Sequence, residues 1–451
     1  METINKTIKY DPDFGYSVCG NTLGEAWVRT VECVMKNGLE EADESRDRKA
    51  LQNFRIKSHT QNLPDPIFEK YGKKENIEAM INLVFKEPVM KDFDVVTNFR
   101  VGAKSYKTRL EEGNMLNFVI GRLAKIPESK KAVMVFPTYE DYKQVLGSPF
   151  NDYLPCIVSV QFRLRPEENG VQKLNTIFNM RSWNIDQKGA GDLTIMAILT
   201  KRVAEELSKK LEVKVIPGSL DALVTDIHVY KETYEQAQTT VDHYNRDLQI
   251  EEQSERWGSR ANTWEKEITS PNHYANFEGG YEKFLKLEEQ ILSKLAPVKT
   301  AIDLGCGTGQ TSKLLENKAE TIYILDIAGK MLDEAKKRVP KAIPLLASVT
   351  SIPLPNESVD IAISRGVVVS HLPSSLTDSF FTELGRVVRQ SGKIMFDYIS
   401  NLESVDFKNQ SPKITFTKKE MREKLEQNGF INIISDGHVT DRVMRVIADK
   451  R

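Results

Sequence analysis

The chain has 451 residues, of which 40% are hydrophobic and 28% charged, and its 63 Lys and Arg nearly balance 64 Asp and Glu. This length favours two or three domains over one, and the composition is typical of globular proteins rather than disordered or membrane-embedded ones. The net charge of −1 argues against a basic nucleic-acid-binding surface over the whole chain. A local anion pocket is compatible with it.

The cysteines and the hydropathy indicate the compartment. Four cysteines in so long a chain make no disulfide framework and no CxxC pair; they are Cys19, Cys33, Cys156 and Cys306. No apolar run approaches the roughly 20 residues that cross a bilayer, and the first residues lack the apolar core of a signal peptide. We therefore expect a soluble cytoplasmic protein with neither a membrane nor a nucleic acid as partner.

A polar stretch divides the chain into two predicted domains, residues 1–235 and 255–451. Residues 236–254 carry many charges and few large apolar side chains, so they are predicted to be a linker or a solvated helix.

The N-terminal domain mixes helices with strands. Residues 24–38 have apolar side chains at helical spacing and end on a glycine, which predicts a helix. Residues 154–165 alternate apolar and polar from Cys156 onward and predict a half-buried strand. Residues 193–211 predict a long helix whose apolar first half is buried. The pattern of this domain therefore mixes helices and strands.

Separate motifs in this domain combine a thiol with an arginine. Cys156 follows Pro155 at the start of the predicted strand, Arg181-Ser182 comes some 25 residues later, and His228 and Tyr230 form a later HxY motif. An electropositive setting favours the thiolate form of cysteine, and arginine makes the bidentate contacts that phosphate prefers. The pattern predicts a cysteine nucleophile beside a phosphate-binding site.

The order PC, QF, RS and HxY resembles thymidylate synthase and its relatives, the pyrimidine-nucleotide hydroxymethylases, over about residues 20–232. The resemblance implies that Cys156 attacks C6 of the pyrimidine, so that C5 takes a one-carbon unit from 5,10-methylenetetrahydrofolate. It also implies an α+β fold for this domain and a homodimer. The substrate-binding residues that it implies are Arg48, Tyr106, Arg109, Lys130, Lys131, Arg181, Ser182, His228 and Tyr230. The family's folate-closing tail is not recognisable after Tyr230, so folate dependence rests on the resemblance alone.

The departures from the family pattern are informative. The family has paired arginines that reach the phosphate of the partner subunit, and Lys130 and Lys131 stand in their place. The lysines keep the positive charge but lack the bidentate guanidinium group. The family glutamate that works with water falls on Glu78, with Glu69 and Glu44 as alternatives.

Asp192 stands where thymidylate synthases have the asparagine that reads uracil. Cytosine offers N3 as an acceptor and a 4-amino donor, and a carboxyl group can serve both once it is protonated or through water. The resemblance to cytidylate hydroxymethylases therefore implies a cytosine nucleotide, CMP or dCMP. The alternative is that Asp192 is only the N-cap of the helix that follows.

The C-terminal domain alternates strands and helices, which predicts a Rossmann-like doubly wound parallel sheet. The expected strands are residues 299–306, 321–327, 359–364 and 392–399, and the expected helices are 310–317, 331–339 and 378–388. Two last strands, 431–439 and 441–449, are expected to form a closing antiparallel hairpin.

The sharpest motif is DLGCGTG, from Asp303 to Gly309, between a predicted strand and a predicted helix. Glycines let a backbone turn tightly and approach a ligand closely. A second strand ends at Asp326, 21 residues after Gly305, where an acidic side chain can accept hydrogen bonds from both ribose hydroxyls. Together these features indicate a nucleotide cofactor.

This motif resembles motif I of class I S-adenosylmethionine (SAM)-dependent methyltransferases, and the resemblance covers about residues 255–451. It implies SAM as cofactor, with Asp303 and the loop facing the methionine part and Asp326 the ribose. The family usually has an aspartate near the adenine, where this chain has Ser348 and then Val349. The cofactor-binding residues that it implies are Asp303, Gly305, Gly307, Gly309, Asp326, Ser348 and Val349.

The remaining polar residues of this domain give weaker signals. Cys306 is interpreted as packing inside the loop. His371 is a candidate base near the methyl acceptor, and a structural histidine is equally compatible with the sequence. Arg365, Tyr274 and Tyr281 are further candidates on the acceptor side.

These expectations combine into a bifunctional enzyme. One domain hydroxymethylates C5 of a cytosine nucleotide, and the other methylates that product or a downstream pyrimidine, which suits biosynthesis of a modified nucleoside or antimetabolite. One alternative is a dUMP or dCMP C5 methylase with an appended methyltransferase. A second is a non-catalytic nucleotide-binding module attached to an active methyltransferase.

Overall fold

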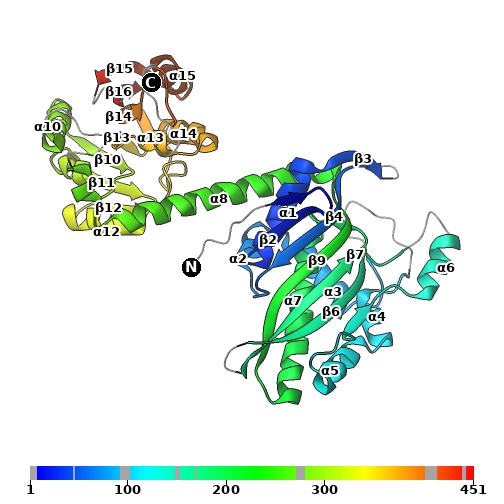
Figure 1. The fold of residues 1–451 in the computed structure, drawn as a ribbon. Helices are drawn as coiled ribbons and strands as arrows, with labels where there is room; N and C mark the ends of the chain where they lie inside the picture. Colours follow the sequence, from blue (N-terminus) through cyan, green and yellow to red (C-terminus); the bar gives the residue numbers. More distant parts are fainter. Residues whose placement is uncertain are drawn as a thin grey trace. The chain divides into compact units, whose positions relative to one another are not determined.

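The structure is a computed structural model, and it describes residues 8–43, 46–91, 102–147, 153–167, 170–270, 280–401, 414–438 and 443–451. The chain forms two compact units, Met1–Tyr244 and Asn245–Arg451 (Figure 1). Their boundary falls inside helix α8 (Tyr234–Arg260), so the predicted linker is helical. None of the helices in the described ranges is long and apolar enough to cross a membrane.

The described part of the first unit contains a nine-stranded sheet in the order β1-β2-β4-β9-β7-β6-β5, with β3 paired to β4 and β8 to β9. The strands are β1 (Lys9–Asp11), β2 (Gly15–Gly20), β3 (Leu39–Asp43), β4 (Arg46–Ser58), β5 (Val133–Val135), β6 (Ile157–Pro166), β7 (Gln172–Met180), β8 (Trp183–Asn184) and β9 (Val215–Tyr230). Strands β4 and β9 pair antiparallel and set Arg48 opposite Tyr230.

Helices of the first unit pack against this sheet and against one another. They are α1 (Leu23–Asn37), α2 (Pro66–Tyr71), α3 (Lys74–Phe85), α4 (Tyr106–Glu112), α5 (Met115–Lys125), α6 (Tyr139–Gly147) and α7 (Gly189–Leu211). Helix α1 begins after Thr22, whose hydroxyl accepts a hydrogen bond from the backbone of Glu25, and its C-cap is Gly38, as the glycine signal predicts. Helix α7 is the long buried helix expected from residues 193–211.

The second unit is built on a sheet with the order β12-β11-β10-β13-β14-β16-β15. The strands are β10 (Val298–Leu304), β11 (Ala319–Asp326), β12 (Ile343–Leu346), β13 (Val359–Ser364), β14 (Val388–Ile399), β15 (Phe430–His438) and β16 (Val443–Lys450). The first five run parallel, whereas β16 pairs antiparallel with both β14 and β15. The predicted parallel sheet and its closing hairpin are therefore confirmed.

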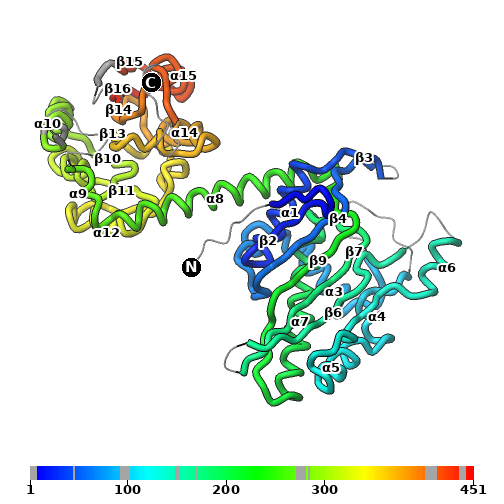
Figure 2. Tube along the Cα trace, in the orientation of Figure 1, coloured from blue at the N-terminus to red at the C-terminus, as the bar shows by residue number. Residues whose placement is uncertain are grey.

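Two separate apolar clusters pack the helices of this unit against the sheet. One cluster includes Leu332 and Ala335 of α12, and the other includes Phe380 of α14 and Leu425 of α15. The helices are α9 (Trp264–Ile268), α10 (Gly280–Ser293), α11 (Gln310–Leu314), α12 (Gly329–Arg338), α13 (Val368–His371), α14 (Thr377–Val387) and α15 (Lys418–Gln427). Figure 2 traces this alternation of strand and helix along the chain.

The strand order of the second unit reverses at β10, whose neighbours are β11 and β13. In doubly wound sheets a crevice opens outside the carboxyl ends of the strands at such a switch point, and ligands bind there. The glycine loop follows β10 directly, so the fold carries it to this crevice.

Candidate functional site

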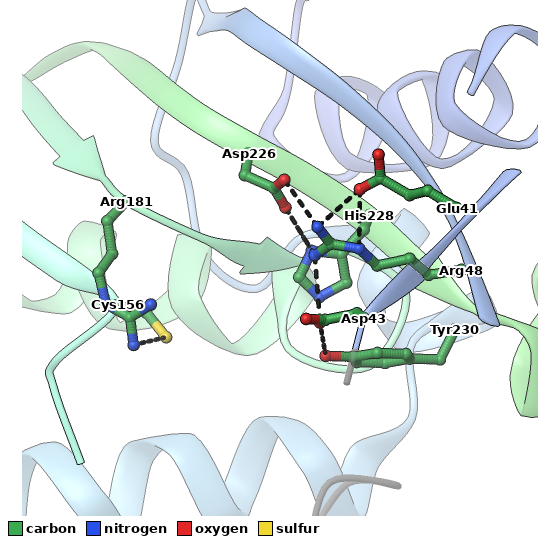
Figure 3. A network of polar contacts seen from close by, with 8 residues as sticks. All are labelled: Glu41, Asp43, Arg48, Cys156, Arg181, Asp226, His228 and Tyr230. Carbon is green, nitrogen blue, oxygen red and sulfur yellow. Dashed lines mark hydrogen bonds and ion pairs between the residues drawn. The ribbon is translucent and has the colours of Figure 1, made fainter. Parts of the chain in front are cut away.

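The first unit brings the predicted nucleophile and its arginine together. Cys156 is half-buried immediately before β6, and Arg181 Nη2 lies 4.0 Å from its Sγ. The arginine is held in place because it also donates to the backbone oxygens of Leu154 (2.7 Å) and Pro155 (3.2 Å). Figure 3 shows the two side chains pointing toward each other. The structure thus places a guanidinium beside the predicted nucleophile.

Tyr106 connects this thiol with Asp192. Its phenol oxygen accepts a hydrogen bond from the backbone N–H of Ile157 (3.1 Å), the residue after Cys156. Burial raises the pKa of Tyr106 well above its usual value, and the nearby Tyr153, Cys156 and Asp192 add to the rise. Tyr106 therefore lies within electrostatic reach of both the predicted nucleophile and the predicted base-reading residue.

Asp192 is not a helix N-cap. Helix α7 begins at Gly189 after Lys188, which places Asp192 inside the first turn with 3% of its surface exposed. Its Oδ2 accepts a hydrogen bond from the indole Nε1 of Trp183 at 2.8 Å. Burial raises the pKa of Asp192 to about 7, although the Lys188 charge and the Trp183 hydrogen bond both lower it. The N-cap alternative is therefore wrong, and a neutral carboxyl group is populated at neutral pH.

His228 and Tyr230 meet edge to face with ring centroids 4.8 Å apart, as the HxY spacing on one strand face requires. The phenol of Tyr230 donates to Asp43 Oδ2 (3.1 Å). The His228 Nδ1 lies 2.9 Å from Asp226 Oδ1, and hydrogen bonds from His228 and Arg48 hold the pKa of Asp226 below its usual value in spite of burial.

Arg48 was predicted to bind phosphate. In the structure its guanidinium forms ion pairs with carboxylates instead. It pairs with Glu41 (2.7 Å), Asp226 (3.0 Å) and Asp43 (3.3 Å), as Figure 3 shows. These three negative charges outnumber the single arginine and repel an incoming anion. A phosphate at Arg48 would first have to displace them, so this arrangement does not support that role.

Arg109 is also a structural residue. Its side chain is 3% exposed and makes a bidentate pair with Asp141, each bond 2.7 Å long. It donates as well to the Phe136 carbonyl (2.9 Å), so its hydrogen-bonding capacity is used within the protein. The predicted substrate contact of Arg109 is therefore corrected.

Most of the other predicted residues of this unit are exposed. Glu78 is exposed on α3, where it pairs with Lys74 at 4.0 Å. Glu69 is exposed on α2, and Glu44 lies outside the described residues. Lys130 and Lys131 are exposed before β5. Ser182 follows Arg181 at intermediate exposure.

In the second unit, the glycine loop takes a conformation that side chains disfavour. Gly305 and Gly309 have φ of +72° and +79°. A Cβ on Gly305 would lie 2.7 Å from Val368 Cγ2, and one on Gly309 would lie 2.9 Å from the Ala335 backbone. The loop can therefore turn sharply into α11 only with glycine at these positions.

A cavity of about 200 Å³ lies at this loop. Six of the seven residues predicted to bind the cofactor line it, namely Asp303, Gly305, Gly307, Asp326, Ser348 and Val349. Gly309 does not line the cavity; it allows the backbone of α12 to pack closely against the loop at Ala335. The Ser348 hydroxyl is hydrogen-bonded to Thr350 (2.7 Å).

Two buried carboxylates face this cavity. Asp303 Oδ2 accepts from the Ser312 hydroxyl (2.5 Å), while Oδ1 has no hydrogen-bond partner among the described residues. Burial raises the pKa of Asp303 to about 7. Asp326 accepts from the backbone N–H groups of Gly307 and Ala328, both at 2.9 Å, and burial raises its pKa too.

The comparisons with known proteins concern this unit. Residues 302–396 match the family model of the methyltransferase domain. The malonyl-acyl-carrier-protein O-methyltransferase of Serratia marcescens is 31% identical over 135 residues, which are 28% of this chain and 51% of that protein. The uncharacterized methyltransferase YodH of Bacillus subtilis is 33% identical over 124 residues, 26% of this chain and 51% of that protein. The chain thus spans about half the length of these relatives.

Among solved structures, the SAM-bound magnesium protoporphyrin IX methyltransferase of Synechocystis aligns with a TM-score of 0.36 at 15% identity, covering 45% of this chain and 97% of that chain. The second unit contains a class I SAM-dependent methyltransferase domain. The family match runs from the last residues of β10 into β14 and includes the loop and Asp326.

The residues of the methyltransferase domain fit SAM. The buried, unpartnered Asp303 Oδ1 suits a cationic group, and SAM carries both an ammonium and a sulfonium. The positive-φ glycines leave the loop backbone open to a ligand. Cys306 inside the loop is buried, and burial raises its pKa well above the usual value, which supports a packing role.

The cavity lining includes residues that the sequence did not identify. Gln249, Gln253 and Trp257 of α8 line it together with Trp264 of α9. The Trp257 ring meets Trp264 (5.5 Å) and His371 (5.2 Å) edge to face. These aromatic rings form an apolar wall beside the glycine loop.

The predicted acceptor-side candidates also line the cavity. His371, Arg365 and Tyr281 are among its lining residues. Arg365 is paired with the buried Asp397, and burial raises the pKa of Tyr281 to about 12. Tyr274 lies outside the described residues.

Proposed function

We propose that the methyltransferase domain transfers a methyl group from SAM to an oxygen atom of a small-molecule acceptor. The observation that carries this proposal is the cavity in which Asp303 and Asp326 face a glycine loop. Relatives named as O-methyltransferases support oxygen as the acceptor atom. When bound, SAM supplies an electrophilic methyl group on a positively charged sulfur.

Different residues would bind the cofactor, exclude water and accept the proton. Asp303 Oδ1 accepts from the ammonium group and Asp326 from the ribose hydroxyls. The wall of Trp257 and Trp264 excludes water, which would compete with the acceptor. His371 at the acceptor end takes the proton that the hydroxyl loses as its oxygen is methylated.

Calorimetry with SAM and S-adenosylhomocysteine tests the cofactor assignment. Asp326→Asn is expected to weaken binding of both by roughly tenfold, because it replaces a charged acceptor of the ribose hydroxyls. Asp333→Asn, an exposed carboxylate on α12, is the matched control and should bind like the wild type. Wild-type protein that binds neither compound would contradict the proposal.

We further propose that the first unit hydroxymethylates C5 of CMP or dCMP with 5,10-methylenetetrahydrofolate. The pairing of Cys156 with Arg181 and the buried Asp192 supports it. By the resemblance, the thiolate adds to C6, and C5 attacks the folate methylene. Loss of the C5 proton with elimination of tetrahydrofolate would leave an exocyclic methylene; hydroxide from water would add to it, and the electrons returned to C5 would expel the Cys156 thiolate. The new hydroxyl is a suitable acceptor for the methyltransferase domain. We propose a homodimer for this unit, after the same resemblance.

Product mass analysis tests this second function. The protein is offered CMP, dCMP and dUMP separately with the folate, each with and without SAM. We expect a gain of CH2O on a cytosine nucleotide, and a further CH2 when SAM is present.

Two cysteine variants separate the domains. Cys156→Ala should abolish the gain of CH2O and preserve SAM binding, while Cys19→Ala should change neither. A gain of CH2 on dUMP without SAM would favour the C5 methylase alternative. No change on any nucleotide would favour a non-catalytic nucleotide-binding module.

A further inference from the structure

Strand pairing and ring packing both fix the Trp183 side chain that donates to Asp192. It begins β8 and pairs with Ile227 of β9, and 1% of its surface is exposed. Its ring packs edge to face against Phe178, with centroids 5.5 Å apart. From this position its indole Nε1 donates to Asp192 Oδ2 at 2.8 Å. The orientation of the Asp192 carboxyl group is therefore set by the sheet.

We propose that Trp183 determines which oxygen of Asp192 carries the proton, and that it thereby makes the first unit select cytosine over uracil. The inference rests on the proposed hydroxymethylase function, in which Oδ1 faces N3 of the base. An indole N–H can only donate, so Oδ2 must accept from it in either protonation state. The carbonyl oxygen of a protonated carboxyl group is a better acceptor than its hydroxyl oxygen, so this hydrogen bond favours the proton on Oδ1.

This placement of the proton distinguishes the two bases. Cytosine presents an acceptor at N3 and an amino donor at C4, so Oδ1–H donates to N3 while Oδ2 accepts from the amino group. Uracil presents a donor at N3 and an acceptor at O4, so both contacts are mismatched. If the proton moved to Oδ2, the same carboxyl group would complement uracil. The hydrogen bond from Trp183 disfavours that exchange, because Oδ2 accepts less well once it carries the proton.

The surroundings of Asp192 keep the neutral form available. Its pKa of about 7 reflects burial, opposed by the Lys188 charge at the start of α7 and by the Trp183 hydrogen bond. Tyr106 of α4 is a further titratable group that interacts with the charge of Asp192. Removal of the indole N–H therefore raises the pKa of Asp192 further.

Trp183→Phe tests the proposal because it keeps a ring in the core and removes the N–H. We expect the ratio of kcat/KM for CMP over UMP to fall roughly tenfold, equivalent to about one misplaced hydrogen bond. The alkaline limb of the CMP pH profile should move to higher pH. Phe178→Leu, which disturbs the same packing and keeps the N–H, should preserve both the ratio and the limb.

A second measurement needs no variant of Trp183. In wild-type protein labelled with 15N-tryptophan, the Trp183 indole resonance should titrate with a midpoint near pH 7, and Asp192→Asn should remove this titration. An unchanged ratio in folded Trp183→Phe, or an indole that does not titrate, overturns this inference alone. Wild-type protein that neither binds nor converts a pyrimidine nucleotide overturns the proposed hydroxymethylase and the inference with it.

Discussion

Lowering the pH from 7.5 to 5 is expected to weaken SAM binding by about 75-fold through the ionisation of Asp303 alone. The pKa of this carboxyl group is raised to about 7 in the unliganded protein because the group is buried. Its ionised fraction falls from about 0.76 at pH 7.5 to about 0.01 at pH 5, a cost of about 2.6 kcal/mol if only the carboxylate accepts from the SAM ammonium.

Calorimetric titration across this pH range measures the effect. At pH 6.5 about three quarters of Asp303 is protonated, so SAM binding should release about 0.75 proton per site, detected as a dependence of the heat on buffer ionisation enthalpy. Asp303→Asn should bind more weakly at pH 7.5 and lose most of the pH dependence. The raised pKa of Asp326 leaves a residual slope in that variant. A wild-type affinity that is the same at pH 5 and 7.5, with the protein folded at both, would refute the reasoning.

Three further changes follow from the packing. Gly309→Ala should destabilise the second unit by about 1–3 kcal/mol and weaken SAM binding, because φ is +79° and the new Cβ meets the Ala335 backbone; thermal denaturation and calorimetry measure the two effects. Arg109→Met should cost about 3–5 kcal/mol in urea unfolding of the first unit, since it leaves Asp141 buried and unpaired, and Arg109→Met with Asp141→Leu should recover much of it. The raised pKa of Asp303 stabilises the fold fully below pH 3.8, and this contribution is lost as the pH rises through about 7, so Asp303→Asn should melt above wild type at pH 8.

The alternating centre of the second unit could be predicted because its information is local, whereas strand β12 and helices α9, α10, α13 and α15 were not expected. The strands β10, β11 and β13 are short apolar runs followed by helices, and the glycine loop and Asp326 come at consecutive strand ends. The carboxyl ends of parallel strands share one edge of the sheet, so residues adjacent in this pattern meet in space. The cavity lining confirms that logic for six of the seven residues.

The contribution of α8 was missed because the helix is mostly polar. Its few buried residues before the boundary, Ala237, Val241 and Tyr244, recur at i, i+4 and i+7, and this spacing was the available signal for a helix. Nothing local indicated that Trp257 lines the cavity. The same limit explains Arg109, whose role depends on Asp141, a partner 32 residues away.

Asp192 and Asp303 have similar surroundings, although they belong to two different folds. Each is a buried carboxyl group with a pKa raised to about 7, and each receives one side-chain hydrogen bond on Oδ2, from Trp183 or from Ser312. Burial without a cationic partner costs stability, which a sequence retains only where the charge has another use. These donors fix the direction in which each carboxyl group points. We place the base at one of these two raised-pKa carboxyl groups and the cofactor at the other.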